Sequence, residues 1–242
     1  MHILAFNSSP RGKEESKTEL VLQQFLEGAR RAGAAAETLY LRDYRIKHCL
    51  GCFGCWFETP GRCVQKDDMT GELYDRFLAA DLVILASPLY HYNLNARLKA
   101  VIERTLPMIK PDFVDRGAKT GHPLRLERAP RIVALSVCAF PEQENFKALS
   151  LNLKMIFGQG LVAEIYRHSS EFMAIPELAP QVAAVLAAVA QAGEEVVRLG
   201  RVEPETQEAL SRDLASREML IRAANQEFSQ IELRRSKPGE QP

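Results

Sequence analysis

The chain has 242 residues, of which 46% are hydrophobic and 26% are charged. This composition is ordinary for a folded protein, so it excludes a mainly disordered chain. Basic and acidic residues number 31 each, and a formally neutral chain offers no global field for nucleic acid or an anionic membrane.

Strand and helix patterns alternate over the first 166 residues. Short apolar runs predict strands at residues 2–6, 37–41, 81–86, 131–137 and 161–166. Amphipathic patterns predict intervening helices at residues 18–32, 67–78, 94–108 and 145–157. Five strands joined by helical crossovers indicate an α/β fold with a doubly wound, five-stranded parallel sheet.

The sequence changes character in its last quarter. Residues 180–199 and 204–228 predict two amphipathic helices. We therefore expect one domain at residues 1–176 and a C-terminal helical extension at residues 177–242. The extension should pack on the sheet or build an oligomer interface, and its tail, residues 234–242, should be frayed.

The chain start and the cysteines bear on where the protein works. The start has no basic leader and reaches polar Asn7 and Ser8 too soon for a signal peptide. The longest apolar run, residues 182–190, is about half the length of a membrane-spanning helix. We therefore expect a cytoplasmic protein that does not bind membranes. In that reducing compartment, the five cysteines should be thiols or metal ligands rather than disulfides.

The loop between the first strand and the first helix, residues 7–18, has the chemistry of a phosphate site. A loop that ends at a helix N-terminus presents unpaired backbone N–H groups. Hydroxyl donors come from Ser9, Ser16 and Thr18, and Arg11 adds a positive charge. An ordinary capped loop is the alternative. The spacing is not that of a Walker loop, so it does not predict nucleoside triphosphate hydrolysis.

Two further loops should lie beside the first, because the carboxyl ends of parallel strands meet in a crevice where the strand order reverses. The segment after the third strand contributes Pro88, Leu89, Tyr90 and Asn93, and the segment after the fourth contributes Ser136 and Cys138. Aromatic faces and backbone amides there suit a flat heterocycle, and aromatic packing at a strand end is the alternative. His91 is expected to be an ordinary loop residue rather than a catalytic base.

Four of the five cysteines form one compact motif, C-x2-C-x2-C-x7-C, made of Cys49, Cys52, Cys55 and Cys63. Thiolates at this spacing resemble the runs that bind iron–sulfur clusters, and the glycines between them permit tight turns. A structural zinc site usually separates two cysteine pairs by about a dozen residues or more. The motif therefore favours a 4Fe-4S cluster, with zinc and metal-free thiols as alternatives.

Taken together, these segments resemble the flavodoxin-like NADPH-dependent FMN reductases. The shared features are a Ser-Pro-Arg loop that runs to Ser-x-Thr at a helix start, a Cys-x-Gly-Cys-x-x-Cys segment that ends before Asp67-Asp68-Met69, and Ser87-Pro88-Leu89-Tyr90 followed by Lys99 and Glu103-Arg104. Within that family, the four-cysteine pattern resembles the iron–sulfur flavoproteins. The resemblance covers residues 1–170.

The resemblance implies a flavodoxin-like fold and an FMN cofactor. It implies that the FMN phosphate is bound by Ser9, Arg11, Ser16 and Thr18. It implies that the isoalloxazine ring lies against Pro88, Leu89, Tyr90 and the 136–140 loop. It further implies cluster ligation by Cys49, Cys52, Cys55 and Cys63, NAD(P)H as an electron donor, and a homodimer or homotetramer. Ser8 departs from the glycine often found at its position, and the phosphate loop is longer than usual.

The main hypothesis is therefore a redox flavoprotein that holds FMN and a 4Fe-4S cluster. It would transfer electrons between a reduced donor and an acceptor, either a small molecule or a redox protein. No side chain need act as an acid or base, so no catalytic residue is predicted. The alternative is a cluster-free NAD(P)H-dependent FMN reductase acting on quinones, flavins or nitroaromatics. A third hypothesis is a non-enzymatic binding module in which the cysteines hold zinc.

Overall fold

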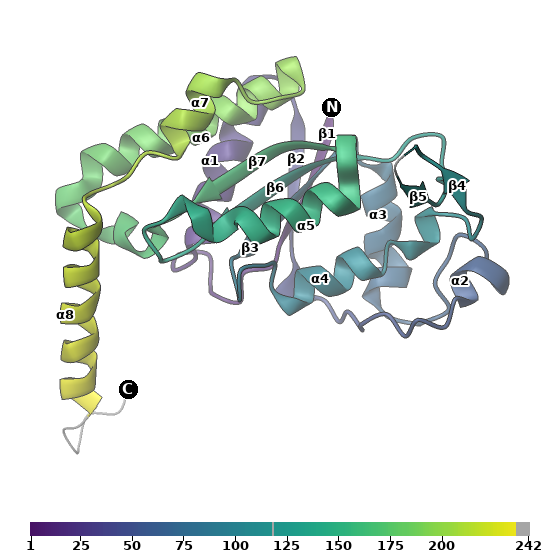
Figure 1. Cartoon of the computed structure of the whole chain (residues 1–242), viewed down its shortest axis with the longest axis horizontal. Coiled ribbons are helices and arrows are strands. Elements are labelled where there is room, and N and C mark those ends of the chain that lie inside the picture. Colours follow the sequence, from purple (N-terminus) through teal and green to yellow (C-terminus); the bar gives the residue numbers. More distant parts are fainter. Residues whose placement is uncertain (118, 236–242) are drawn as a thin grey trace.

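The computed structural model describes residues 1–117 and 119–235. At its centre is a parallel sheet of five strands in the order β2-β1-β3-β6-β7 (Figure 1). The strands are β1 (His2–Asn7), β2 (Ala35–Tyr40), β3 (Leu82–Pro88), β6 (Arg131–Val137) and β7 (Leu161–Arg167). The predicted α/β fold is confirmed, and the strand order reverses between β1 and β3, as in flavodoxin.

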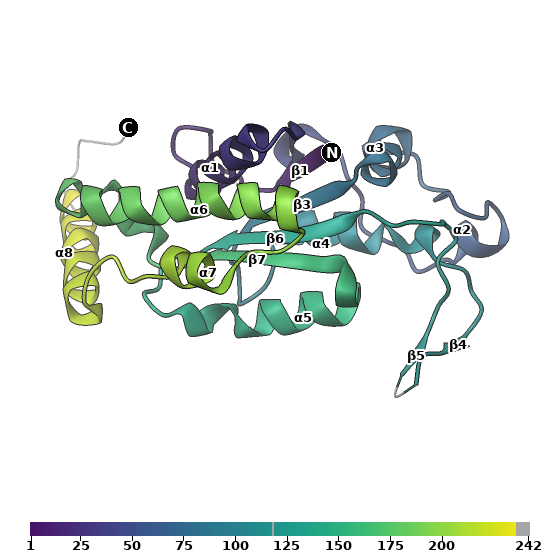
Figure 2. The same ribbon diagram turned by 90° about the horizontal axis from the view of Figure 1, so that it is seen from above.

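Helices cover both faces of the sheet (Figure 2). On one face lie α1 (Lys17–Arg31) and α6 (Ala179–Leu199), and on the other lie α3 (Tyr74–Ala79), α4 (Ala96–Glu103) and α5 (Lys147–Phe157). In β1, Ile3 and Ala5 belong to the apolar core beneath α1 and α6. Leu4 and Phe6 belong to the core on the opposite face. Because successive strand side chains point to opposite faces, a continuous apolar run is buried on both sides.

Helix α6 packs directly on α1, and the two helices share one apolar core with the sheet. Two glycines allow the close approach. A Cβ atom added to Gly28 would lie 1.7 Å from the carbonyl oxygen of Ala190, and one added to Gly193 would lie 2.0 Å from that of Phe25. The first helix of the C-terminal extension is therefore packed against α1, while the domain boundary after residue 176 stays a prediction.

Three helices differ from their predicted lengths. The helix predicted at residues 67–78 starts as a π-helical turn, Met69–Leu73, before α3 begins at Tyr74. The helix predicted at residues 94–108 ends at Glu103 and is followed by a separate 3-10 turn, Leu106–Met108, because Pro107 has no N–H to continue the α-helix. The prediction of a single helix at residues 204–228 was wrong. It is divided into α7 (Pro204–Leu210) and α8 (Arg217–Arg235).

The break between α7 and α8 has a physical cause. The buried guanidinium of Arg167 donates hydrogen bonds to the carbonyl oxygens of Leu210 at 3.1 Å and Arg212 at 2.7 Å. Those carbonyls are satisfied at the end of α7, so the chain turns there instead of continuing the helix. Helix α8 then projects from the body as an arm (Figure 1).

The C-terminal tail is described only in part. Residues 234 and 235 are the last two of α8, and residues 236–242, the rest of the tail predicted to fray, lie outside the described residues. Among residues 1–117 and 119–235, no helix combines the length and the apolar character needed to cross a membrane.

A short hairpin that the sequence patterns did not predict follows α4. Its strands are β4 (Val114–Asp115) and β5 (Thr120–Gly121), which pair antiparallel. Strands of two residues are too short to show an alternating pattern, so periodicity could not have found them.

The contact between α1 and α6 yields a prediction about stability. Gly193→Ala should lower the free energy of unfolding by about 1–3 kcal/mol, because the added methyl group meets the backbone of α1 and forces the helices apart. The measurement is urea unfolding followed by circular dichroism. Gly71→Ala is the matched control, since nothing lies within 4 Å of its Cβ position. Equal stability of Gly193→Ala and the wild type would contradict the prediction.

Candidate functional site

A cavity of about 510 Å³ opens at the carboxyl ends of β1, β3 and β6. It lies where the strand order reverses, which is where open α/β sheets bind ligands. Its volume is usual for a small-molecule site. Of the ten residues predicted to bind a cofactor, those that line the cavity are Ser9, Arg11, Thr18, Pro88, Leu89, Tyr90 and Cys138.

The loop between β1 and α1 forms a polar, positively charged end of the cavity. Ser16 caps α1, because its hydroxyl accepts a hydrogen bond from the backbone N–H of Glu19 at 3.1 Å. It does not line the cavity but donates to Oγ of Ser9 at 2.8 Å. Arg11 and Lys17 line this end. Because the first N–H groups of a helix have no partner within it, the loop can hold an anion.

Glu171 also lines this end, and the sequence analysis missed it. Nη1 of Arg11 donates to Oε1 of Glu171 at 2.8 Å. Glu171 lies in the 3-10 helix Ser170–Ala174, shortly after β7. The one sequence feature that could have predicted a role for Glu171 is its position shortly after the end of a strand. The ion pair connects the phosphate-type loop to the segment after β7.

The segment after β3 forms the second wall. The backbone N–H of Leu89 donates to the carbonyl oxygen of Val137 at 2.8 Å, which ties this wall to the end of β6. Asn93 does not line the cavity. It exchanges two backbone hydrogen bonds with Tyr90, at 2.9 and 3.0 Å, and so closes a tight turn. The tip of that turn, His91 and Tyr92, lines the cavity as well.

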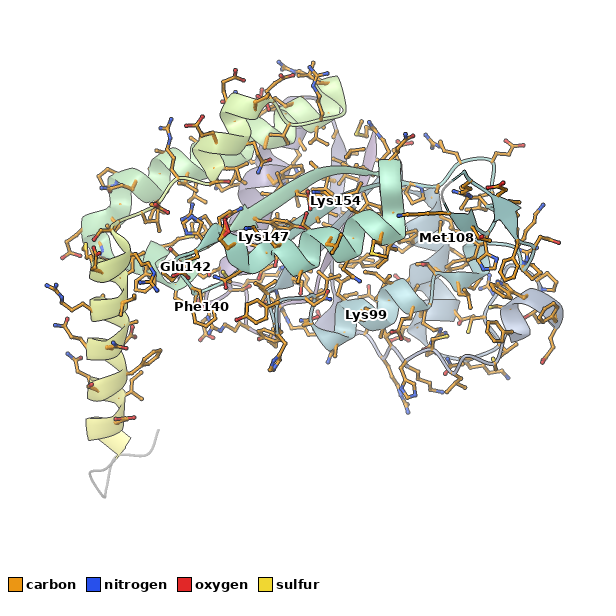
Figure 3. All side chains as sticks on the ribbon, in the orientation of Figure 1. Lys99, Met108, Phe140, Glu142, Lys147 and Lys154 are labelled. Atoms are coloured by element: carbon orange, nitrogen blue, oxygen red, sulfur yellow. The ribbon has the colours of Figure 1, made fainter. Side chains whose placement is uncertain are left out.

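The segment after β6 forms the third wall. Cys138 lines the cavity, and burial raises the pKa of its thiol to about 12, so it is neutral at pH 7. Ser136 is fully buried within β6 and does not reach the cavity. Phe140 also lines the cavity and is 60% exposed. Figure 3 shows Phe140 near the start of α5, on the side from which α8 projects.

The four-cysteine loop surrounds the short helix α2 (Gly54–Phe57), at the end of the molecule opposite α8 (Figure 1). All four thiols are free, with Cys55 buried and Cys52 exposed. Burial raises the pKa of the Cys55 thiol, and the nearby thiols of Cys63, Cys49 and Cys52 raise it further. Within the described ranges, no three His, Cys, Asp or Glu side chains are arranged to hold a metal ion.

A buried ion pair fixes the chain that follows this loop. Nη1 and Nη2 of Arg104 donate to the two carboxylate oxygens of Asp67 at 2.7 and 3.0 Å. Lys47 joins them through its backbone, since its N–H donates to Asp67 at 2.9 Å and its carbonyl accepts from Arg104 at 3.0 Å. Burial raises the pKa of Asp67, but hydrogen bonds from Arg104 and Lys47 outweigh burial and hold that pKa below its usual value.

The fold and the cavity at the strand-order reversal define a flavodoxin-like α/β protein with a cofactor-type site. The sequence model of the NADPH-dependent FMN reductase family matches residues 1–119. Over these residues, which are just under half of the chain, the protein is similar to that family.

Among sequence relatives, an iron-sulfur flavoprotein of Archaeoglobus fulgidus is 33% identical over 105 residues, which cover 43% of this chain and 49% of the relative. An iron-sulfur flavoprotein of Methanosarcina thermophila is 31% identical over 113 residues, covering 47% of this chain and 56% of the relative. The matched region thus spans about half the length of these relatives.

Solved structures share the fold over a larger part of the chain. An FMN-dependent NADH-azoreductase from Bacillus anthracis, in complex with FMN, superposes with a TM-score of 0.59 at 14% identity, covering 82% of this chain and 100% of that one. An NAD(P)H:quinone oxidoreductase from Methanothermobacter marburgensis gives a TM-score of 0.58 at 17% identity, covering 81% of this chain and 96% of that one. At these identities the likeness establishes the fold.

The Arg104–Asp67 pair yields a second prediction. Asp67→Asn should lower the free energy of unfolding at pH 7 by roughly 3–5 kcal/mol, because it leaves a buried guanidinium without its counter-charge. Urea unfolding measures this loss. Asp75→Asn is the matched control: its exposed pair with Arg62 should contribute little. The prediction fails if the two variants are equally stable.

The same pair gives a pH dependence with a defined sign. Because the pKa of Asp67 is lower in the folded than in the unfolded chain, its stabilisation is complete above the unfolded value of about 3.9. That stabilisation is lost as the pH falls further, through the folded pKa. The difference in stability between wild type and Asp67→Asn should therefore shrink below about pH 4. A difference that grows on acidification would reverse the sign and contradict the assignment.

Proposed function

We propose that the protein is an FMN-dependent oxidoreductase that takes electrons from NAD(P)H and passes them to an acceptor. The observation that carries this proposal is the cavity at the strand-order reversal, which joins a cationic, hydroxyl-rich end to apolar and aromatic walls. A flat ring with a phosphate tail matches both ends. Similarity of residues 1–119 to the NADPH-dependent FMN reductase family supports the same conclusion.

The side chains of the cavity would bind and orient the cofactor. Ser9, Thr18 and the first N–H groups of α1 would hold the phosphate, and Arg11 would neutralise its charge. Ser16 would act through Ser9, to which it is hydrogen-bonded. Pro88, Leu89, Tyr90 and Cys138 would flank the flavin ring, while Asn93 would keep the Tyr90 turn closed. Bound FMN supplies the hydride and electron transfer, and no acid or base is required from the chain.

We further propose that Cys49, Cys52, Cys55 and Cys63 hold a 4Fe-4S cluster. Four free thiols on one loop are the donor set of such a cluster, and a cluster binds each thiol through a different iron atom rather than through one ion. The relatives named iron-sulfur flavoproteins support this proposal. A cluster would pass electrons singly to or from the flavin site.

A cluster-free reductase is the second candidate. It is supported by the name of a further relative. A relative named FMN-dependent NADH:quinone oxidoreductase, from Methylorubrum populi, is 48% identical over 44 residues. In this case the acceptor would be a quinone, a free flavin or a nitroaromatic compound.

We also propose that the protein works in the cytoplasm as a homodimer or homotetramer. Helix α8 supports an oligomer, because it leaves the body with much of its apolar surface exposed. Phe228 is 61% exposed, Met219 45%, and Ile221 and Ile231 37% each. Apolar exposure of this kind on a projecting helix is typical of a subunit contact.

The flavin site is tested by titrating the purified protein with FMN and following the quenching of flavin fluorescence. Arg11→Ala should weaken FMN binding roughly tenfold, since a charged hydrogen bond to phosphate is lost, and should barely change riboflavin binding. Arg198→Ala is the control, because Arg198 is an exposed arginine of α6 that does not line the cavity. Equal losses for FMN and riboflavin would show that Arg11 does not contact the phosphate.

The cluster is tested by the visible spectrum of anaerobically purified protein before and after dithionite. A broad, bleachable shoulder at the long-wavelength side of the flavin bands is expected, together with about four iron atoms per chain. Cys52→Ala should remove the iron and leave the flavin, whereas Leu50→Ala, at an exposed site in the same loop, should keep both. A wild-type protein with flavin and no iron would establish the cluster-free reductase instead.

A further inference from the structure

A buried carboxylate, that of Glu19, lies in the first turn of α1, where the anion-type loop ends. Glu19 is only 7% exposed and follows the cap residue Ser16 by three positions. The pattern Ser-x-x-Glu predicts a capping box, in which the acidic side chain accepts from the backbone N–H of the cap residue. Here that N–H donates instead to the carbonyl oxygen of Gly12 at 3.0 Å. The Glu19 carboxylate is therefore used for contacts other than capping.

Three side chains, from β1, β2 and α1, donate hydrogen bonds to this carboxylate. Nδ2 of Asn7, the last residue of β1, donates to Oε2 of Glu19 at 2.6 Å. The hydroxyl of Tyr40, the last residue of β2, donates to Oε1 at 2.8 Å, and Nε2 of Gln23 donates to the same oxygen at 2.9 Å. Burial, and then the contact with Glu19, raise the pKa of Tyr40 to about 12, so its hydroxyl keeps the proton that it donates.

The Glu19 carboxylate determines which way the Asn7 amide is turned. An ionised carboxylate only accepts hydrogen bonds, whereas an amide has a donor end and an acceptor end. With Nδ2 of Asn7 on Glu19, Oδ1 is left to accept from the backbone N–H of Ser9, at 2.9 Å. Asn7 is fully buried, so the protein supplies both of these partners. Glu19 thus acts on Ser9 through Asn7.

Ser9 is held from a second side through its hydroxyl. Oγ of Ser9 accepts from the hydroxyl of Ser16 at 2.8 Å and from the backbone N–H of Arg11 at 3.3 Å. Among the hydrogen bonds of the described residues, Oγ of Ser9 accepts these two and donates none. Since Ser9 lines the cavity, its hydroxyl proton is left for an acceptor there.

We propose that Glu19 is the positioning residue of the phosphate site. Its carboxylate orients Asn7, and Asn7 holds Ser9 with the hydroxyl proton available to a phosphate oxygen of the cofactor. The inference rests on the proposed FMN function and adds a residue that does not itself line the cavity. Two other roles predict different results. A purely structural link between strands and helix would affect all flavins equally, and simple repulsion of phosphate by the Glu19 charge would make its removal tighten FMN binding.

The test is a parallel titration of the flavin-free protein with FMN and with riboflavin, followed by quenching of flavin fluorescence. Glu19→Ala should weaken FMN binding roughly five- to tenfold and leave riboflavin binding within about twofold, because only FMN carries the phosphate. Glu27→Ala is the matched control in the same helix, with a side chain 57% exposed, and should change neither affinity. Equal losses for both flavins, or tighter FMN binding by Glu19→Ala, would overturn the inference.

A second pair of variants exchanges donor and acceptor and keeps the net charge. Asn7→Asp alone sets two carboxylates against each other, so it should weaken FMN binding by about tenfold. Adding Glu19→Gln lets the new amide donate to the new carboxylate while its oxygen still accepts from Tyr40. This double variant should bring FMN binding back to within about threefold of the wild type. A double variant that binds FMN no better than Asn7→Asp would overturn the inference.

The wild-type titration separates this inference from the function on which it rests. If the wild-type protein does not bind FMN, both the proposed function and the role of Glu19 are overturned. If the wild type binds FMN and Glu19→Ala binds it equally well, only the role of Glu19 is overturned.

Discussion

The constraint on which the rest of the structure depends is the position of β1 between β2 and β3 in a parallel sheet. All strands end at one edge, and the connection after β1 runs to α1 on one face while that after β3 runs to α4 on the other. The two loops therefore diverge and leave a crevice. Ser8 holds its floor together, since its N–H donates to the carbonyl oxygen of Ala86 at 2.9 Å. The cavity is therefore a consequence of the sheet topology. The side chains that line it make one end polar and the other end aromatic.

The short helix α4 connects the two candidate sites mechanically. At its N-terminus, Asn95 caps the helix and holds the carbonyl of Ser8 in the β1–α1 loop. At its C-terminus, buried Arg104 holds Asp67 and the backbone of Lys47 at the two ends of the cysteine loop. A buried ion pair contributes little net stability but fixes geometry, because either partner alone would be an uncompensated charge. One rigid element thus positions both the flavin-type cavity and the cysteines.

The sequence predicted the sheet and the identity of the site loops well, because both follow from local patterns. Continuous apolar runs marked the buried strands β1, β3 and β6. The chemistry of Ser9, Arg11 and Tyr90 marked loops that parallel strands must bring together. Features set by distant contacts were missed. Glu171 joins Arg11 across 160 positions, and the end of α7 depends on Arg167, a strand residue. The β4–β5 hairpin was too short to leave a periodic signal.

Local preference and structure disagree at few places, and two of these coincide with the candidate sites. Positive φ without glycine occurs at His91 and Tyr92 beside the cavity, at Phe53 in the cysteine loop, and at Ser169, which precedes the cavity-lining Ser170. Elsewhere, glycines take the left-handed positions or the close helix contacts, as at Gly28 and Gly33. In most of the fold, the residue type agrees with the backbone conformation that it adopts. Around the two candidate sites it does not, which indicates that a side chain is needed there despite the unfavourable backbone conformation. The departures therefore point to ligand recognition rather than to loose packing.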